Sequence, residues 1–228
     1  FQTPPATRGP STARCLILVT PDAQRTMCTY LGASVGLDPS DLDLGMVREA
    51  RVLYLEGYLW DSEDAKRAFI AASDAMRQAG GLVALSLSDA FCVQRHRESF
   101  LELVDGHVDV LFANEIEIMS LYRVNTFEEA AERVRGCTEV AALTRSEKGS
   151  LVLTAEETIP IDPFRLGELV DTTGAGDLYA AGFLTALTRG ESLRRCGQLG
   201  SLCAGQVVTQ LGPRPQVSLP DLVARYLP

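Results

Sequence analysis

The chain has 228 residues, 46% of them hydrophobic, and a formal net charge of −9 at pH 7. This length suffices for one large domain with a sizeable core. The acidic balance argues against a nucleic-acid surface, which needs clustered lysine and arginine. No apolar run reaches the roughly eighteen residues of a membrane helix, and no secretory signal is recognisable. We therefore predict a cytoplasmic protein with neither a nucleic-acid nor a membrane partner.

The first part of the chain predicts a loop followed by a β-hairpin. Phe1 is not a methionine, and Gln2–Thr12 is rich in Pro, Thr and Gly, as loops are. The β-prone runs Arg14–Thr20 and Thr26–Leu31 are separated by the turn residues Pro21-Asp22-Ala23. This pattern divides the chain into a loop and hairpin at 1–34 and an α/β core at 35–228.

The middle of the chain alternates short apolar runs with longer helical periods, after a short helix (41–50) that Ser40 is expected to cap. Such alternation is typical of buried parallel strands with helices on both faces of the sheet. The predicted strands are 52–55, 82–85, 108–112 and 140–144, and the predicted helices are 62–79, 90–104, 114–121 and 126–136.

The last third predicts an antiparallel edge and then helices. Runs 150–154 and 158–161 are expected to pair, and helices are expected at 177–189, 192–210 and 220–225. The six cysteines lie in apolar contexts without a C-x-x-C pair, so all are expected to be reduced core residues: Cys15, Cys28, Cys92, Cys137, Cys196 and Cys203.

The most informative run is Asp171-Thr172-Thr173-Gly174-Ala175-Gly176-Asp177, just before a helical segment. The two glycines allow the backbone amides to approach one oxyanion closely, and the helix adds the positive end of its dipole. Asp177 would lie beside that anion, where it can take a proton from an attacking hydroxyl. The alternative is an ordinary helix start in which Thr172 or Thr173 is the N-cap.

These residues resemble a known family. DTTGAGD followed by the small and apolar run Leu178–Phe183 resembles the C-terminal signature of the ribokinase-like PfkB carbohydrate kinases, which phosphorylate sugars and nucleosides with ATP. The resemblance implies an α/β fold: a three-layer α/β/α arrangement with a mostly parallel central sheet and part of a small β lid. The family's N-terminal portion, about a third of its length, is not found in this sequence. By resemblance Asp177 is the catalytic base, and Gly174, Ala175 and Gly176 form the anion hole.

The resemblance also assigns ligand-binding residues. Asn114 and Glu117 match an N-x-x-E motif in which the Glu orders Mg²⁺, although the pair can equally be a capping box. Run 144–149 resembles a T-x-G-x-x-G turn beside the nucleotide, with Ser146 in place of the usual glycine. The implied nucleotide-binding residues are Asn114, Thr144, Gly149, Thr172, Thr173, Ala204, Val208 and Gly212, and Arg25 is the implied acceptor-binding arginine.

The predicted function is ATP-dependent phosphoryl transfer to the 5′-hydroxyl of adenosine. Run 20–27 resembles the adenosine kinase-like branch, as do Glu56–Leu59 and Ser86–Asp89 more weakly. Leu16, Leu18 or Tyr30 would line the nucleoside pocket if the hairpin belongs to the lid. The alternatives are a sugar kinase of the same family, acting on ribose or fructose, and a non-catalytic nucleotide-binding fragment. The expected ligands are ATP, Mg²⁺ and a small nucleoside or sugar, and a homodimer is compatible with the resemblance.

Overall fold

The computed structural model describes residues 7–228, so the start of the predicted N-terminal loop lies outside the described part. The core is a six-stranded sheet in sequential order. Four strands run parallel: β3 (Val52–Glu56), β4 (Leu82–Ser86), β5 (Val110–Asn114) and β6 (Val140–Thr144). Two antiparallel strands, β7 (Ser150–Leu153) and β8 (Thr158–Ile161), complete one edge. The predicted antiparallel edge is therefore confirmed.

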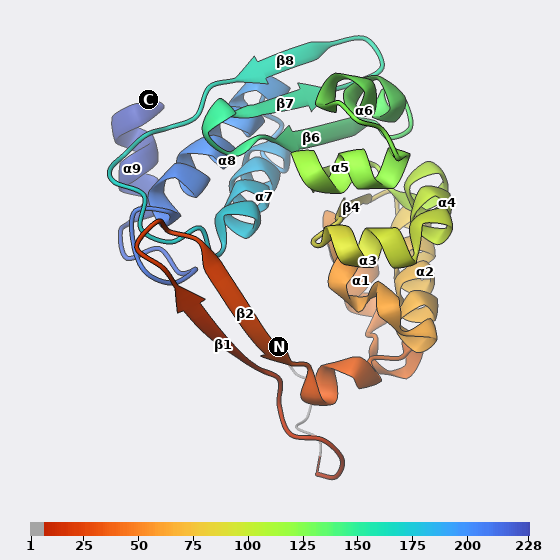
Figure 1. Cartoon of the computed structure of the whole chain (residues 1–228). Helices are drawn as coiled ribbons and strands as arrows, with labels where there is room; N and C mark the ends of the chain where they lie inside the picture. Colours follow the sequence, from red (N-terminus) through yellow and green to blue (C-terminus); the bar gives the residue numbers. More distant parts are fainter. Residues whose placement is uncertain (1–6) are drawn as a thin grey trace.

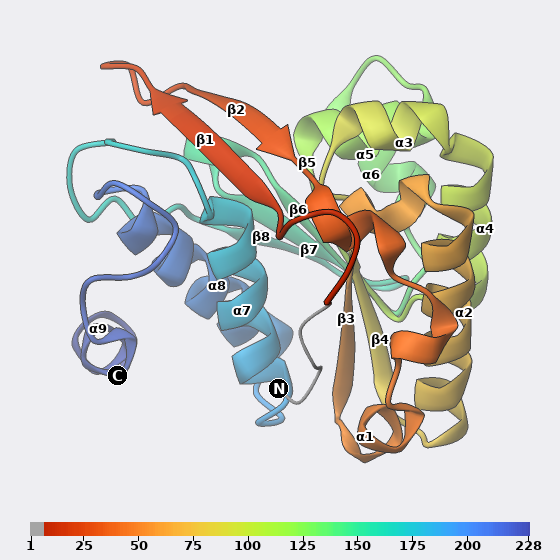
Figure 2. The same ribbon diagram turned by 90° about the horizontal axis from the view of Figure 1, so that it is seen from below.

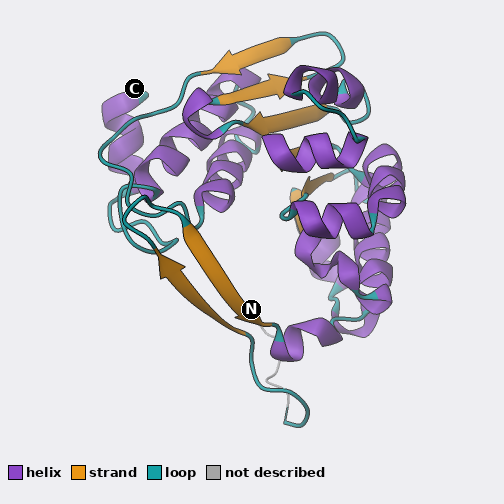
Figure 3. Cartoon of the chain, in the orientation of Figure 1, coloured by secondary structure: helices purple, strands orange, loops and turns teal. Residues whose placement is uncertain are grey.

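Helices cover both faces of this sheet and make the fold a three-layer α/β/α arrangement (Figures 2 and 3). One layer contains α1 (Leu44–Glu49), α2 (Glu63–Gln78), α3 (Ala90–Arg95), α4 (Arg97–His107), α5 (Glu115–Tyr122) and α6 (Phe127–Val134). The other contains α7 (Ala175–Leu187), α8 (Leu193–Val207) and α9 (Leu219–Tyr226). No helix within residues 7–228 has the length and apolar character needed to cross a membrane.

Alternation of side chains along the strands explains why two helical layers form. Leu111 and Ala113 of β5 pack toward α2–α6, whereas Val110 and Phe112 of the same strand pack toward α7 and α8. Successive strand residues point to opposite faces, so a strand that is apolar at every position needs cover on both. The apolar runs of the sequence thus correctly predicted this architecture.

The hairpin of β1 (Arg14–Val19) and β2 (Arg25–Tyr30) extends away from the three layers (Figure 1). It forms a separate two-stranded antiparallel sheet, which fits the lid of the ribokinase fold. Because both faces of this sheet are largely solvent-exposed, Cys15 and Cys28 are exposed, and their prediction as core residues was wrong. All six cysteines are free thiols.

Two predicted helices differ from the observed ones. The helix expected over 90–104 is interrupted at His96, whose φ of −120° and ψ of 27° are not helical. The Asp61 carboxylate lies 2.7 Å from Nε2 of His96 and accepts three hydrogen bonds from Arg95, and these tertiary contacts fix the break. The helix expected over 41–50 starts only at Leu44, because the Asp43 carboxylate caps it by accepting from the Met46 N–H.

Helices α7 and α8 approach each other closely through glycine. A Cβ atom added at Gly182 of α7 would lie 2.7 Å from the carbonyl oxygen of Leu199, and one at Gly200 of α8 would lie 2.7 Å from that of Tyr179. Side chains at these positions would push the two backbones apart. The glycines therefore place the start of α7, and the signature loop before it, at a set distance from α8.

We expect Gly182→Ala to lower the free energy of unfolding by about 1–3 kcal/mol, because the added methyl overpacks the α7–α8 contact. Gly106→Ala is the matched control, since Gly106 is also helical but an added Cβ would meet nothing within 4 Å. The control should be neutral or stabilising, by about 0.5–1 kcal/mol. Urea unfolding of both variants measures this, and equal losses would contradict the close-packing interpretation.

Candidate active site

The carboxyl ends of the parallel strands bring together polar residues that are distant in sequence. Asn114 at the end of β5 is the register partner of Thr144 at the end of β6. Glu56 ends β3, and Ser88 follows β4 by two residues. In open α/β sheets, ligands bind beyond these strand ends. The residues predicted from two separate motifs, Asn114 and Thr144, are therefore neighbours on one sheet edge.

The signature loop is held in shape by the buried carboxylate of Asp171. Its Oδ1 accepts hydrogen bonds from the Thr173 N–H (2.8 Å) and hydroxyl (2.6 Å), and its Oδ2 accepts from the Gly212 N–H (2.9 Å). Burial alone would raise the pKa of Asp171, but these hydrogen bonds outweigh it and the pKa is lowered. The sequence analysis included Asp171 in the signature run but assigned it no role, although an acidic residue at the start of a glycine-rich loop could have indicated one.

Gly174 is the N-cap residue of α7 and has a φ of 82°, in the left-handed region. A Cβ atom there would lie 2.6 Å from the Cβ of Pro213, so the position also requires the absence of a side chain. Neither Thr172 nor Thr173 caps the helix, because the Thr173 hydroxyl is bound to Asp171 and Thr172 contacts the hairpin. The alternative of a threonine-capped helix start was wrong.

The first turn of α7 presents backbone donors and a carboxylate together. Gly176 and Asp177 lie within the first turn, where N–H groups have no intrahelical partner. No side chain occupies the N-cap position. The N–H groups and the helix dipole thus favour an anion at this point, and the exposed Asp177 side chain lies beside it.

Arg25 joins the hairpin to the signature loop. Its Nη1 donates a 2.5 Å hydrogen bond to the Thr172 hydroxyl. Strand register places Arg25 opposite Val19, so Ile17 and Met27 share its face of the hairpin. Leu16, Leu18 and Tyr30 alternate onto the other face of the hairpin. Their place in a nucleoside pocket stays a prediction.

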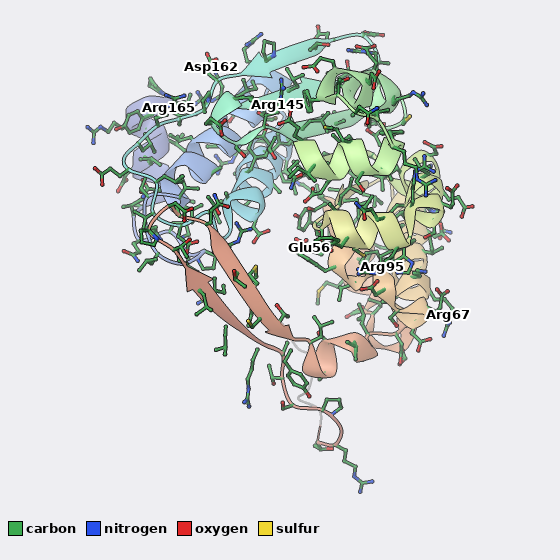
Figure 4. All side chains as sticks on the ribbon, viewed as in Figure 1. Glu56, Arg67, Arg95, Arg145, Asp162 and Arg165 are labelled. Carbon is green, nitrogen blue, oxygen red and sulfur yellow. The ribbon has the colours of Figure 1, made fainter. Side chains whose placement is uncertain are left out.

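Glu56 lies at the candidate site, although the sequence analysis assigned no site role to it within the run Glu56–Leu59. Its carboxylate accepts a 2.7 Å hydrogen bond from Ser88, whose φ of 63° is unusual for a residue other than glycine. Burial raises the pKa of Glu56, hydrogen bonds from Ser88 and Tyr54 act against this, and Asp177 adds to the rise. The electrostatic influence of Asp177 reaches Tyr54 as well. Asp177 thus influences the carboxylate of Glu56, which is labelled in Figure 4, although β3 and α7 are distant in sequence.

Asn114 and Glu117 form a capping box at the start of α5. The Asn114 side chain accepts from the Glu117 N–H (2.9 Å), and the Glu117 carboxylate accepts from the Asn114 N–H (2.9 Å). Burial, with smaller contributions from the carboxylates of Asp89 and Glu56, raises the pKa of Glu117 to about 7 against the opposing hydrogen bond from Asn114. Glu117 is 6% exposed. Its capping role therefore coexists with the negative charges of neighbouring carboxylates.

This environment fits Mg²⁺ held mainly through water and phosphate. Within residues 7–228 no group of three or more His, Cys, Asp or Glu side chains is arranged to hold a metal by itself. The carboxylates of Asp89 and Glu56 nevertheless add to the raised pKa of Glu117, and a divalent cation would relieve that repulsion. Mg²⁺ keeps several waters and needs few protein ligands. The donor set thus suits a cation shared with a polyphosphate, with Glu117 as its protein carboxylate.

The turn after β6 also requires unusual backbone geometry. Gly149 has a φ of 83°, and a Cβ there would meet the Ile161 carbonyl oxygen at 2.1 Å. Ser146 has a φ of 51°, so a serine occupies a left-handed position where the resembling motif has glycine. Ser146 thus has a backbone conformation that glycine adopts more readily.

The end of α8 adjoins the signature loop. The carbonyl oxygen of Val208 accepts hydrogen bonds from the Val170 (2.8 Å) and Asp171 (3.3 Å) N–H groups. Gly212 is bound to Asp171, and Ala204 is partly buried on the α8 side of the sheet. Val208 and Gly212 thus border the signature loop, and Ala204 lies one turn earlier on α8.

Comparison with known proteins identifies the family. The model of the pfkB family carbohydrate kinases matches residues 6–220, and the chain belongs to this family. A probable sugar kinase from Rhizobium etli CFN 42 is 47% identical, with a TM-score of 0.96 over 98% of this chain and 68% of that protein. The adenosine kinase from Sinorhizobium meliloti is also 47% identical, with a TM-score of 0.96 over 99% of this chain and 69% of that protein.

The curated relatives are longer than the chain. A nucleoside kinase from Methanocaldococcus jannaschii is 34% identical over 136 residues, which are 59% of this chain and 43% of that protein. The chain spans less than two thirds of the length of the curated relatives that it matches. The family is thus shown, and the activity of the whole protein is a matter for proposal.

We expect the stability of the metal-free protein to depend on pH through Glu117. Its folded-state pKa of about 7 lies above the ordinary 4.5, so the folded protein binds a proton that the unfolded chain has lost. Its contribution to stability is therefore complete below pH 4.5 and is lost as the pH rises through about 7.

Urea unfolding between about pH 5 and 7.5 measures this contribution. Glu117→Gln should flatten the decline in unfolding free energy, whereas Glu102→Gln, on the exposed side of α4, should leave it unchanged. In the wild type, adding Mg²⁺ together with ATP should also reduce the decline of the unfolding free energy with rising pH. Equal pH slopes for the wild type and Glu117→Gln would contradict the assignment.

Proposed function

We propose that the protein transfers the γ-phosphoryl group of ATP to a primary hydroxyl of a nucleoside, with adenosine as the preferred acceptor. The observation that carries this proposal is the start of α7. This start combines the first-turn N–H groups, a glycine with positive φ and the exposed carboxylate of Asp177. The chain that contains it belongs to the pfkB family.

Asp177 is the general base in the proposed reaction. It accepts the proton of the acceptor hydroxyl while the new bond from that oxygen to the γ-phosphorus forms and the bond to the β-phosphate oxygen breaks. The N–H groups of Gly174, Ala175 and Gly176 stabilise negative charge on the transferring group. Mg²⁺, when bound, supplies neutralising charge to the phosphates. Glu117 would hold it from the start of α5, and Asn114 would contact the nucleotide.

The nucleotide-side residues surround this start of α7 in the proposed complex. Thr144 and Gly149 shape the turn after β6, and Thr172 and Thr173 belong to the signature loop. Ala204, Val208 and Gly212 border that loop from α8 and the segment after it, where they would contact the adenine of ATP. The pairing of Asn114 with Thr144 at the strand ends, and the hydrogen bonds that join Val208 and Gly212 to the signature loop, support this placement.

Two observations favour a nucleoside over a free sugar. Arg25, from the run that resembles adenosine kinase-like proteins, contacts the signature loop directly. The half-exposed ring of Tyr58 lies among the site charges, since Asp89, Glu117 and Arg25 all influence its pKa, which burial raises most. An accessible aromatic ring in such a place can stack on a purine. The relatives alone do not decide, because the two solved structures of equal identity are a probable sugar kinase and an adenosine kinase.

Asp177→Asn should lower kcat by about 10²-fold or more while ATP still binds, because the amide keeps the size of the carboxylate but cannot accept the proton. Asp105→Asn, an exposed position on α4, is the control and should retain wild-type turnover. The turnover number, and the affinity for ATP by calorimetry, are measured on the natural gene product at its full length. Asp177→Asn with more than about a tenth of wild-type turnover would overturn the assignment of the base.

Adenosine should be phosphorylated with a higher kcat/KM than ribose or fructose, because a nucleoside buries an additional aromatic surface in the site. A panel of adenosine, cytidine, ribose and fructose tests this at saturating ATP. If a free pentose or hexose is phosphorylated with a higher kcat/KM than adenosine, the kinase function stands and the proposed preference for adenosine is wrong. No transfer to any of them, with ATP binding intact, would favour the non-catalytic alternative.

A further inference from the structure

Arg145 contacts the elements on both sides of the candidate phosphate site. It follows β6 directly and closes the turn to β7, where its N–H donates to the carbonyl oxygen of Gly149 (2.8 Å). Its guanidinium lies 4.0 Å from the ring centroid of Phe127, the first residue of α6. Its Nη2 donates to the carboxylate of Glu115, the first residue of α5, at 3.1 Å.

The charges around Arg145 make it the link between these elements. Glu128 of α6 also lies 3.6 Å from its Nη2, so two carboxylates from different helices meet at one guanidinium. Without that cation the carboxylates of Glu115 and Glu128 would repel each other. Lys148, at 3.8 Å from Glu115, can compensate only the charge. A lysine lacks the planar fork that stacks on an aromatic ring and bridges two acids.

The position of Glu115 gives this link a consequence for the site. Glu115 lies between Asn114 and the helix residues that follow, and Asn114 and Glu117 form the capping box. On the other side of Arg145, the turn contains Ser146 and Gly149, both with positive φ. Exposed ion pairs contribute little to global stability. The guanidinium, at 22% exposure, is therefore better suited to fixing the position of α5 relative to the turn.

We propose that Arg145, labelled in Figure 4, is a positioning residue that couples the turn after β6 to the start of α5. The two segments together would then form one side of the site for ATP and Mg²⁺. This inference rests on the proposed kinase function for its kinetic consequence. Its structural content, the coupling of two segments, does not depend on catalysis.

Arg145→Met tests the proposal, and Arg135→Met is the matched control. The side chain of Arg135 is similarly buried (24% exposed) and also forms an ion pair, with Glu132. It binds the β7–β8 connection, however, which lies at the amino ends of the parallel strands and so away from the candidate site. Both variants should lose similar stability. Only Arg145→Met should raise the concentration of Mg·ATP needed for half-maximal rate, by about tenfold, with the KM for adenosine unchanged. Arg145→Lys should restore part of this loss.

Hydrogen exchange of the ligand-free protein supplies a readout that is independent of activity. Arg145→Met should speed exchange in both 114–117 and 144–149, and Arg135→Met in neither. Faster exchange in only one segment, or equal Mg·ATP dependence in the two variants, would overturn the coupling. If the wild type transfers no phosphoryl group, the proposed function fails while the exchange result still decides this inference. If Arg145→Met does not fold, Arg145→Lys and Glu115→Gln are measured in the same way.

Discussion

The hydrogen bonds that Asp171 accepts determine the shape of the candidate active site. One carboxylate oxygen holds Thr173 inside the signature loop, and the other holds Gly212 after α8. The loop can pass so close to Pro213 only because Gly174 has no side chain. A buried carboxylate is costly unless it is hydrogen-bonded, and here every bond it accepts joins the loop to itself or to its neighbour. The orientation of the first turn of α7, and so of Asp177, depends on this arrangement.

A second constraint is the accumulation of negative charge at the carboxyl edge of the sheet. Glu56, Glu117 and Asp177 come from β3, α5 and α7. Burial is the main cause of the raised pKa of both glutamates, Asp177 adds to the rise at Glu56, and Asp89 and Glu56 add to it at Glu117. Such a cluster opposes folding unless a cation or hydrogen-bond donors offset it. The capping box and the Ser88 hydroxyl offset part of it. The remaining repulsion is the physical basis on which we expect Mg²⁺ and ATP to bind together.

Local patterns were sufficient for much of the fold and for part of the site. Continuous apolar runs predicted the parallel strands and the helices on both faces, because such a strand must be covered twice. The run 140–144 was placed correctly to the residue. Helix ends that depend on contacts between distant residues were not, as at His96, where Asp61 interrupts the predicted helix. Exposure of Cys15 and Cys28 was also missed, because an apolar hairpin reads like a core strand until its packing is known.

The sequence by itself determined the α/β class, the family resemblance and the individual motifs, since each depends on residues that are close along the chain. Only the tertiary structure brought Glu56 near Asp177, paired Asn114 with Thr144, and placed Arg25 on Thr172. It also decided that Ile17 and Met27, and not Leu16 and Leu18, share the face of Arg25. These juxtapositions join residues that are separated by whole strands and helices. Sheet order and strand register, which no local pattern encodes, set the distances between them.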